Sequence, residues 1–430
     1  MKQNVAIIGG GLAGLTAATY LARAGYDVTV FEQSTGYGGR ARTQEHDGFY
    51  FNQGAHALYL AAKGVQVLKE LEIPFSGKKT NYIVQAIKDK KQYLFPVDKK
   101  TIYESPLLSE SGKKSLADFY ETLPTIDTTK IQNVTLSDWL AENVVDIDAI
   151  SFIQAMIQLN TFVSDPQIQS AGTALAQLQM GNGGVMYLDN GWQTLADGLA
   201  LKAKSYGAKI ISNKKVVSVE FDDAVRGITL SDGTKVEASI VILATPPSVA
   251  SSLMGKRIPH IERFATSAIP LKTASLDVAL SRLPNPDNSF ALGIDSPLYL
   301  SVHSSFAKLA PEDGAFIHLS KYLNHTNHEE PKKIRSELEE LLDMMQPNWR
   351  KYLVKERFLP NMTTSNAILT TSQNGFDGRP SPQINGVENL YVVGDWVGHE
   401  GWLADASFAS ARQAAELIVN KIAIVQRYVV

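Results

Sequence analysis

Hydrophobic positions near the start of the chain change their spacing twice. Residues 4–8 form a short β-branched and apolar run, residues 14–24 are rich in alanine and leucine, and residues 27–31 are β-branched again. These runs predict a strand, a helix and a second strand, with Gly25 as the signal that ends the helix. We therefore expect the chain to open on a βαβ unit.

Further along, the pattern alternates between two kinds of segment. Residues 78–189 combine polar loops, a hairpin within YIVQAIKDKKQYLFPV and helical stretches such as LSDWLAENV, with Ser137 or Thr135 as its cap. Residues 190–262 return to core-type sequence and include the apolar strand SIVILAT. Residues 263–384 hold the strand TASLDVAL and a charged helix ended by Pro347, and residues 385–430 predict strand, glycine-rich turn and long helix.

These segments predict two domains. Residues 1–77, 190–262 and 385–430 are assigned to one discontinuous domain, and residues 78–189 and 263–384 to an inserted one of mixed α+β structure. A chain of 430 residues has room for both, because domains usually span ~100 to 200 residues.

Composition narrows the classes of function. The formal net charge is −3, with no basic excess to favour a nucleic-acid partner. The chain has no cysteine, which excludes disulfides, a redox-active dithiol and a flavin tethered through sulfur. Any redox chemistry must therefore come from a bound cofactor.

Location is predicted from the apolar stretches. The longest near the middle, SIVILATPPSVASSLM, contains two prolines and is shorter than the ~20 residues that a membrane helix needs. Three consecutive glycines would break the helix of an N-terminal signal peptide. We expect a cytoplasmic protein with at most peripheral membrane contact, in which IVNKIAIVQRYVV is the last helix of the first domain or, alternatively, an amphipathic foot.

A dinucleotide fingerprint lies in the predicted βαβ unit. Gly9, Gly11 and Gly14 form G-x-G-x-x-G where the strand meets the helix, and Glu32 ends the second strand. Glycine allows a tight turn and close approach of a pyrophosphate, the helix N-terminus attracts that anion, and the carboxylate accepts hydrogen bonds from a ribose. The fingerprint alone does not separate NAD from FAD, and a tight turn in another α/β fold is the structural alternative.

A second glycine cluster follows the acidic residue at once. With it, the segment VAIIGGGLAGLTAATYLARAGYDVTVFEQSTGYGGRART resembles the N-terminus of the flavin amine oxidase and phytoene desaturase superfamily. The segment NLYVVGDWVGHEGWLADASFASARQAA is similar to the closing motif of that superfamily. The resemblance implies an FAD-binding Rossmann-like domain, of the glutathione-reductase-like α/β class, with an inserted substrate-binding domain.

The resemblance also implies which residues bind FAD. Gly38, Gly39 and Arg40 would lie along the pyrophosphate and flavin, Gly394 and Asp395 beside the ribityl and pyrophosphate groups, and Trp402 and Leu403 at the flavin ring. Val217, with Val216 one step away, would meet adenine through its backbone. The set predicted to bind FAD without a covalent link is Gly9, Gly11, Leu12, Ala13, Gly14, Glu32, Gln33, Gly38, Gly39, Arg40, Gly54, Ala55, His56, Val217, Gly394, Asp395, Trp402 and Leu403.

Catalytic side chains stay unassigned. Amine oxidases of the superfamily commonly hold a lysine near flavin N5, but the comparable strand ASLDVAL has none, and Lys272 lies a few residues early. His56 could tune the flavin or be a structural histidine, and Trp402 could be an aromatic wall over the flavin or simply core. His325 and His328 lie in a polar segment without further ligands, so no metal site is predicted.

The expected function is FAD-dependent dehydrogenation of a hydrophobic small molecule at carbon, as in the phytoene desaturase branch, by hydride transfer to flavin N5. Oxygen or a quinone would then reoxidise the flavin. One alternative is a flavin amine oxidase that oxidises a C–N bond with oxygen as acceptor. Others are a binding module with purely structural FAD and a nicotinamide dehydrogenase without flavin.

Overall fold

A parallel sheet forms the centre of one half of the molecule. The computed structural model describes residues 3–327 and 329–428, with the backbone alone for 422–428. Its five strands lie in the order β10-β2-β1-β14-β20. Their bounds are Asn4–Ile8 (β1), Asp27–Phe31 (β2), Lys209–Ile211 (β10), Ile240–Leu243 (β14) and Leu390–Val392 (β20). Because β1 and β2 pair in parallel across the helix between them, the predicted βαβ unit is confirmed.

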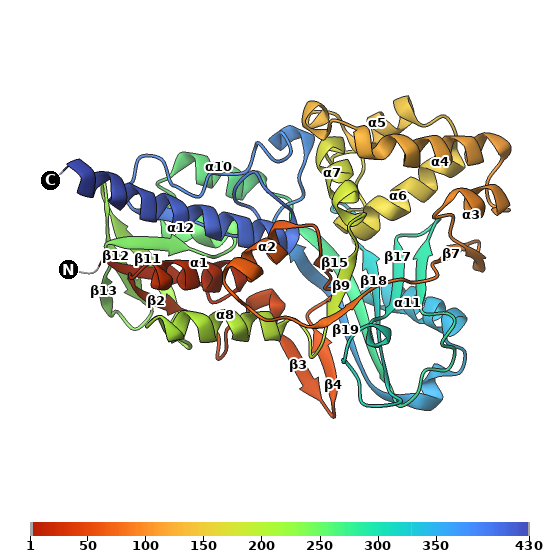
Figure 1. Ribbon diagram of the computed structural model, residues 1–430, viewed down its shortest axis with the longest axis horizontal. Coiled ribbons are helices and arrows are strands. Elements are labelled where there is room, and N and C mark those ends of the chain that lie inside the picture. The colour runs from red at the N-terminus through yellow and green to blue at the C-terminus, as the bar shows by residue number, and fades with distance from the viewer. Residues whose placement is uncertain (1–2, 328, 429–430) are drawn as a thin grey trace.

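Both faces of this sheet are covered, which explains why its strands are apolar runs rather than alternating ones. Successive side chains of β1 point to opposite faces, so Ile7 packs under the helices on one side and Ile8 into the cluster on the other. The helices are α1 (Leu12–Arg23), α2 (Lys63–Glu70), α8 (Gln193–Ser205) and α12 (Leu403–Tyr428) (Figure 1). The opposite face carries β11 (Val216–Phe221), β12 (Val225–Leu230), β13 (Lys235–Glu237), α9 (Pro247–Leu253) and α10 (Pro259–Ser267).

A larger sheet organises the other half. It has seven strands in the order β19-β15-β18-β17-β16-β7-β8. The bounds are Gln85–Lys88 (β7), Lys91–Leu94 (β8), Leu271–Leu280 (β15), Phe290–Gly293 (β16), Leu298–Val302 (β17), Ala315–Tyr322 (β18) and Leu353–Ser365 (β19). All pairs are antiparallel except β16 with β7, which joins the early hairpin to the later strands. Residues far apart in sequence therefore share one surface.

Helices pack on this second sheet in two groups. The helix α11 (Pro331–Met345) buries Leu338 and Leu342 against β15, β17 and β18. A helical group lies beyond the sheet and consists of α3 (Lys99–Glu104), α4 (Glu110–Thr122), α5 (Leu136–Asn143), α6 (Ile147–Thr161) and α7 (Ala171–Gly181) (Figure 1). Of the two caps predicted for α5, Thr135 is the one used, since its hydroxyl accepts from the N–H of Asp138 at 3.1 Å.

Short strands connect the two halves. The strand β9 (Val185–Leu188) pairs with β5 (Leu58–Tyr59) and β6 (Gly77–Lys79), so a late segment returns beside two early ones. The hairpin of β3 (Thr43–His46) and β4 (Phe49–Asn52) inserts Phe51 against Phe316 of β18, with ring centroids 5.0 Å apart. These contacts hold the two sheets on either side of one cavity.

The predicted α/β class with a Rossmann-like domain and an inserted domain is confirmed by this arrangement. We propose that residues 1–77, 190–262 and 385–430 form the first domain and residues 78–189 and 263–384 the second, because the two large sheets draw their strands from these two sets. Among the described helices, none combines the length and apolar character needed to cross a membrane.

Candidate functional site

One large cavity lies between the two sheets. Its volume is about 1590 Å³, above the ~300 to 1,000 Å³ that is common for a single small ligand. It begins where the parallel strands end, at Gly9 after β1, Glu32 after β2, Ala244 after β14 and Gly394 near β20. The carboxyl ends of parallel strands are where α/β sheets bind their ligands. We call this part the cofactor side.

The glycine turn after β1 leaves space for an anion. Gly9 has a φ of +108°, and a Cβ there would lie 2.4 Å from the carbonyl oxygen of Ala244. A Cβ on Gly14 would lie 2.0 Å from the carbonyl oxygen of Gly9, so α1 can approach β1 only because this residue has no side chain. A Cβ on Gly11 would meet nothing within 4 Å. Open space therefore faces the first N–H groups of α1, beside Leu12 and Ala13, as a bound pyrophosphate requires.

Glu32 is fixed by the backbone around it. One carboxylate oxygen accepts from the N–H of Gly10 and the other from the N–H of Ser34, both at 2.8 Å. Only 8% of the residue is exposed, and it lines the cavity with its neighbour Gln33. Each oxygen keeps a lone pair for a further donor, which fits a ribose hydroxyl.

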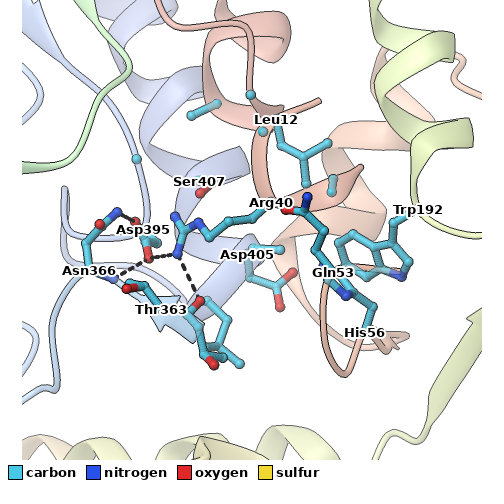
Figure 2. Close-up of a pocket in the computed structure, with 18 of the residues that line it drawn as sticks. Leu12, Arg40, Gln53, His56, Trp192, Thr363, Asn366, Asp395, Asp405 and Ser407 are labelled. Atoms are coloured by element: carbon cyan, nitrogen blue, oxygen red, sulfur yellow. Dashed lines mark hydrogen bonds and ion pairs between the residues drawn. The ribbon is translucent and has the colours of Figure 1, made fainter. Parts of the chain in front are cut away.

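An ion pair joins the two ends of the sequence. Arg40 Nη1 lies 2.9 Å from Asp395 Oδ2, and it also donates to the carbonyl oxygen of Thr364 (Figure 2). Asp395 accepts from the hydroxyl of Ser365 and from both nitrogens of Asn366. Burial alone would raise the pKa of Asp395, but the charge and hydrogen bonds of Arg40, with those of Asn366, lower it to about 2. The pair thus stays ionised and fixes the loop of Gly38 and Gly39 beside the cavity.

The loop after β4 brings a neutral histidine to the cavity. His56 Nδ1 lies 3.0 Å from the carbonyl oxygen of Gly54, and its ring centroid is 4.9 Å from that of Trp192. Burial lowers the pKa of His56 to about 4, so the ring is uncharged near neutral pH. Ala55 and His56 line the cavity, whereas Gly54 lies behind it against Met362.

The remaining predicted residues divide between cavity and core. Val217 lines the cavity beside Lys214 and Lys215 and is 45% exposed. Leu403 also lines it, but Trp402 is 1% exposed and packs with Leu271 in a hydrophobic cluster. All the predicted FAD-binding residues therefore line the cavity except Gly14, Gly54 and Trp402. For Trp402 the core alternative fits the observed position.

The sequence did not point to the opposite part of the cavity, which we call the substrate side. Most of its wall is formed by aromatic and aliphatic side chains from the helical group, β9 and the second sheet with its adjoining loops, to which Thr80, Asn160 and Asn182 add uncharged polar groups. The aromatic and aliphatic members, with one histidine, are Tyr82, Val84, Met156, Leu159, Phe162, Leu178, Val185, Tyr187, Phe290, Tyr299 and His303. These residues come from separate segments that meet only in the folded sheet. The apolar runs in these segments predicted buried residues. A run of apolar residues looks the same in sequence whether its side chains fill the core or line a cavity.

Hydrogen bonds hold the polar atoms of this wall in place. The hydroxyl of Tyr187 lies 3.1 Å from that of Tyr299, which lies 3.1 Å from His303 Nε2. Ser301 links the same hydroxyl of Tyr187 to Tyr82. Burial, with the nearby rings of His318 and His56, places the pKa of His303 well below its usual value. The hydroxyls of Tyr82, Tyr187 and Tyr299 are therefore hydrogen-bonded within the wall, and His303 is uncharged near neutral pH.

Two other predictions concern residues outside the cavity. Lys272 lies on β15 opposite Thr363 and does not line the cavity, so its position does not support a catalytic role. His325 pairs with Asp165, 2.9 Å away, and His328 lies outside the described residues. Within the described ranges, no group of three or more histidine, aspartate or glutamate side chains is placed to hold a metal.

The fold, the anion-binding turn and the two buried carboxylates, Glu32 held by backbone N–H groups and Asp395 paired with Arg40, are features of a flavin-dependent oxidoreductase. A family model for flavin containing amine oxidoreductases matches residues 12–419. The chain belongs to this family.

The chain is similar to proteins that are named for different reactions. A 4,4'-diapophytoene desaturase (4,4'-diaponeurosporene-forming) of Staphylococcus aureus is 25% identical over 317 residues, which cover 65% of this chain and 61% of that protein. The match thus spans less than two thirds of the curated relative. An oxidoreductase from Methanosarcina mazei has a TM-score of 0.77 at 19% identity, covering 96% of this chain and all of the other. A putrescine oxidase variant has a TM-score of 0.78 at 16% identity, covering 98% and 99%.

Proposed function

We propose that this protein binds FAD without a covalent link and dehydrogenates an uncharged hydrophobic small molecule at carbon. One observation carries the choice of substrate. The charged side chains Glu32, Arg40, Lys214, Lys215 and Asp395 line the cavity on the cofactor side, and Asp405 lines it at the start of α12, near Tyr59. No lysine, arginine, aspartate or glutamate belongs to the wall of the substrate side as defined above. The substrate side offers aromatic and aliphatic surface with hydrogen-bonded hydroxyls. Burying a charge against such a wall would be costly without a partner.

The choice of FAD over a smaller flavin follows from the cofactor side. The glycine turn at the N-terminus of α1 suits a pyrophosphate, Glu32 suits the ribose of an adenosine, and the segment at Val217 continues the cavity beyond it. A mononucleotide would leave the turn and the carboxylate without ligands. The absence of cysteine removes the thiolate that one kind of covalent link would need.

Bound flavin would supply the acceptor for a hydride equivalent from a C–H bond of the substrate. The residues of the chain would then provide orientation and exclude water. Tyr187, Tyr299 and His303 form a fixed wall that holds the substrate, and Arg40 with Asp395 fixes the cofactor loop. Oxygen or a quinone would take the electrons from the reduced cofactor.

Oxidation of an amine is the second candidate, favoured by the likeness of the fold to putrescine oxidase. Two features weigh against it here. Lys272 is not in the cavity, and the substrate side has no carboxylate to attract a cationic amine. The similarity to the diapophytoene desaturase supports the first candidate instead.

A purified sample tests the proposal in two stages. Acid denaturation should release a yellow cofactor that chromatographs as FAD, since no covalent link is expected. Panels of uncharged polyenes and of amines are then added without oxygen while the oxidised-flavin band is followed. Bleaching by a polyene, with a product that has lost two hydrogens, supports the proposal. Bleaching by amines alone would establish the second candidate.

A further inference from the structure

A buried carboxyl group lies in the cavity with no positive partner. Asp405 is in the first turn of α12, lines the cavity and is only 5% exposed. Its Oδ1 accepts from the N–H of Gly64 at 2.8 Å. No lysine, arginine or histidine among the described residues pairs with it. Figure 2 shows its carboxyl between the side chains of Arg40 and Gln53, in the space that these residues surround.

The groups around Asp405 leave it isolated. Arg40 is committed to Asp395, and Lys63 at the start of α2 lies 3.5 Å from Glu400. Tyr59 of β5 and the neutral His56 are the other titratable side chains on neighbouring segments that face this part of the cavity. The first turn of α1, packed on the same helix, contributes no titratable group. Among the described residues no positively charged side chain is therefore placed to pair with Asp405, and only the N-terminus of α12 and the N–H of Gly64 offset its charge.

The surroundings also fix the carboxyl in position. A Cβ on Gly64 would lie 2.7 Å from Asp405 Oδ1 and 3.0 Å from the ring of Phe408, so the N–H of Gly64 reaches the carboxyl only because the residue is glycine. Burial raises the pKa of Asp405 to about 7, and the hydrogen bond from Gly64 offsets this only in part. An acid with this pKa changes its charge in the physiological range of pH.

We propose that Asp405 is a positioning residue that takes up a proton when the dinucleotide binds, so that cofactor and proton enter the cavity together. The inference rests on the proposed function, since it needs FAD in this cavity. The cofactor would fill the cavity that Asp405 lines and remove the water that still reaches its carboxyl group, and an ionised carboxylate without a charged partner is costly to bury. The protonated acid avoids this cost and can donate a hydrogen bond from the oxygen that Gly64 does not use.

Coupling between proton uptake by Asp405 and FAD binding predicts the direction in which the affinity for FAD changes with pH. If Asp405 is neutral in the complex, FAD affinity is constant below the pKa of the free acid and falls as pH rises through it. Between pH 6 and pH 8.5 the Kd for FAD should rise by roughly tenfold or more, the weakening expected when one proton is bound with the ligand. The variant Asp405→Asn keeps an oxygen for Gly64 and cannot ionise, so its Kd should change little over the same range.

Equilibrium dialysis of the FAD-loaded protein, with free FAD measured by its fluorescence, gives Kd at each pH. Asp377→Asn is the matched control, because that side chain is 66% exposed and should leave the pH dependence as in the parent. A parent Kd that stays flat across the range would overturn the inference without recourse to any variant. Equal pH dependence in the parent and in Asp405→Asn would do the same. If the protein binds no FAD at any pH, the proposed function itself fails.

Discussion

The two sides of the cavity are built in different ways. On the cofactor side, backbone groups at strand ends and a few paired charges form the site, as at Gly9, Glu32 and the Arg40–Asp395 pair. On the substrate side, side chains from scattered segments form a wall, and their hydroxyls bond to one another. The first kind of site is built from short motifs, each local in sequence, although Arg40 and Asp395 bring together motifs from opposite ends of the chain. The second depends on which strands become neighbours, so it can change its ligand without changing the fold.

The largest effect should come from breaking the ion pair on the cofactor side. Asp395→Ala removes the partner of Arg40 and of the Ser365 and Asn366 donors. Because the Arg40 side chain is 42% exposed while Asp395 is buried, we expect a cost of about 1 to 3 kcal/mol, that of leaving buried donors without their acceptor. We expect lower stability in urea and loss of yellow colour on purification. Asp377→Ala, at an exposed position, should change neither property. Full retention of flavin by Asp395→Ala would show that the pair does not organise the site.

Substitution in the glycine turn after β1 should affect stability and FAD binding nearly as strongly. Gly14→Ala places a Cβ 2.0 Å from the carbonyl oxygen of Gly9, so α1 must move away from β1. Overpacking of this kind destabilises the fold by about 1 to 3 kcal/mol. Displacement of the N-terminus of α1 from the cavity should in addition raise the Kd for FAD, because the N–H groups that face the pyrophosphate move away. Gly36→Ala is the matched control, because its Cβ would meet nothing closer than 3.6 Å. Dialysis against free FAD measures both, and equal Kd values would contradict the role given to the turn.

Low pH should lower the free energy of unfolding, because it protonates Asp395 on the cofactor side. Its pKa is about 2 in the folded protein and about 4 in an unfolded chain, so its contribution is complete above pH 4. That contribution, about 2 kcal/mol, should be lost as pH falls from about 4 toward 2. Urea unfolding at several pH values measures the slope. Asp395→Asn should show a shallower slope, and an equal slope would mean that other carboxyl groups dominate acid unfolding.

A substitution on the substrate side should have the reverse pattern: a small effect on substrate binding and none on FAD binding. Tyr187→Phe removes the hydroxyl that bonds to Tyr299 and Ser301, at a cost of about 1 kcal/mol. We expect the Kd for FAD to be unchanged and KM for the substrate to rise. Tyr103→Phe, on a side chain that is half exposed, serves as the control. A loss of FAD in Tyr187→Phe would mean that the two sides are not independent.

The same difference explains what the sequence could predict. Glu32 was located by the spacing of the dinucleotide fingerprint, whereas Arg40 and Asp395 were expected from the resemblance of their motifs to the flavin amine oxidase and phytoene desaturase superfamily. All three lie at strand ends or in turns, which short motifs describe. Tyr82 and Tyr187 meet only because β9 returns beside early strands and β7 pairs with β16, which depends on long-range topology. The Rossmann-like domain was therefore predictable in outline and the substrate wall was not.

Two residues at the start of α12, Trp402 and Asp405, show that a recognised motif does not tell which of its side chains face the cavity. Trp402 was expected at the flavin ring, yet packing with Leu271 and its neighbours keeps it behind the cavity, because a large apolar side chain can be buried on either side of a backbone turn. Asp405 was not predicted, although it is an acidic residue in a run of small and apolar ones, LADASFASA. An acid in such a helical run is a usable signal for a buried titratable group.

The most direct test of the account compares two substrates that differ only in charge. A polyene and its primary-amine derivative of the same carbon skeleton are each mixed with the FAD-loaded protein without oxygen, and the rate of flavin bleaching is recorded. We expect faster bleaching by the uncharged polyene, because the substrate side carries no carboxylate to accompany a cation. Faster bleaching by the amine would contradict it.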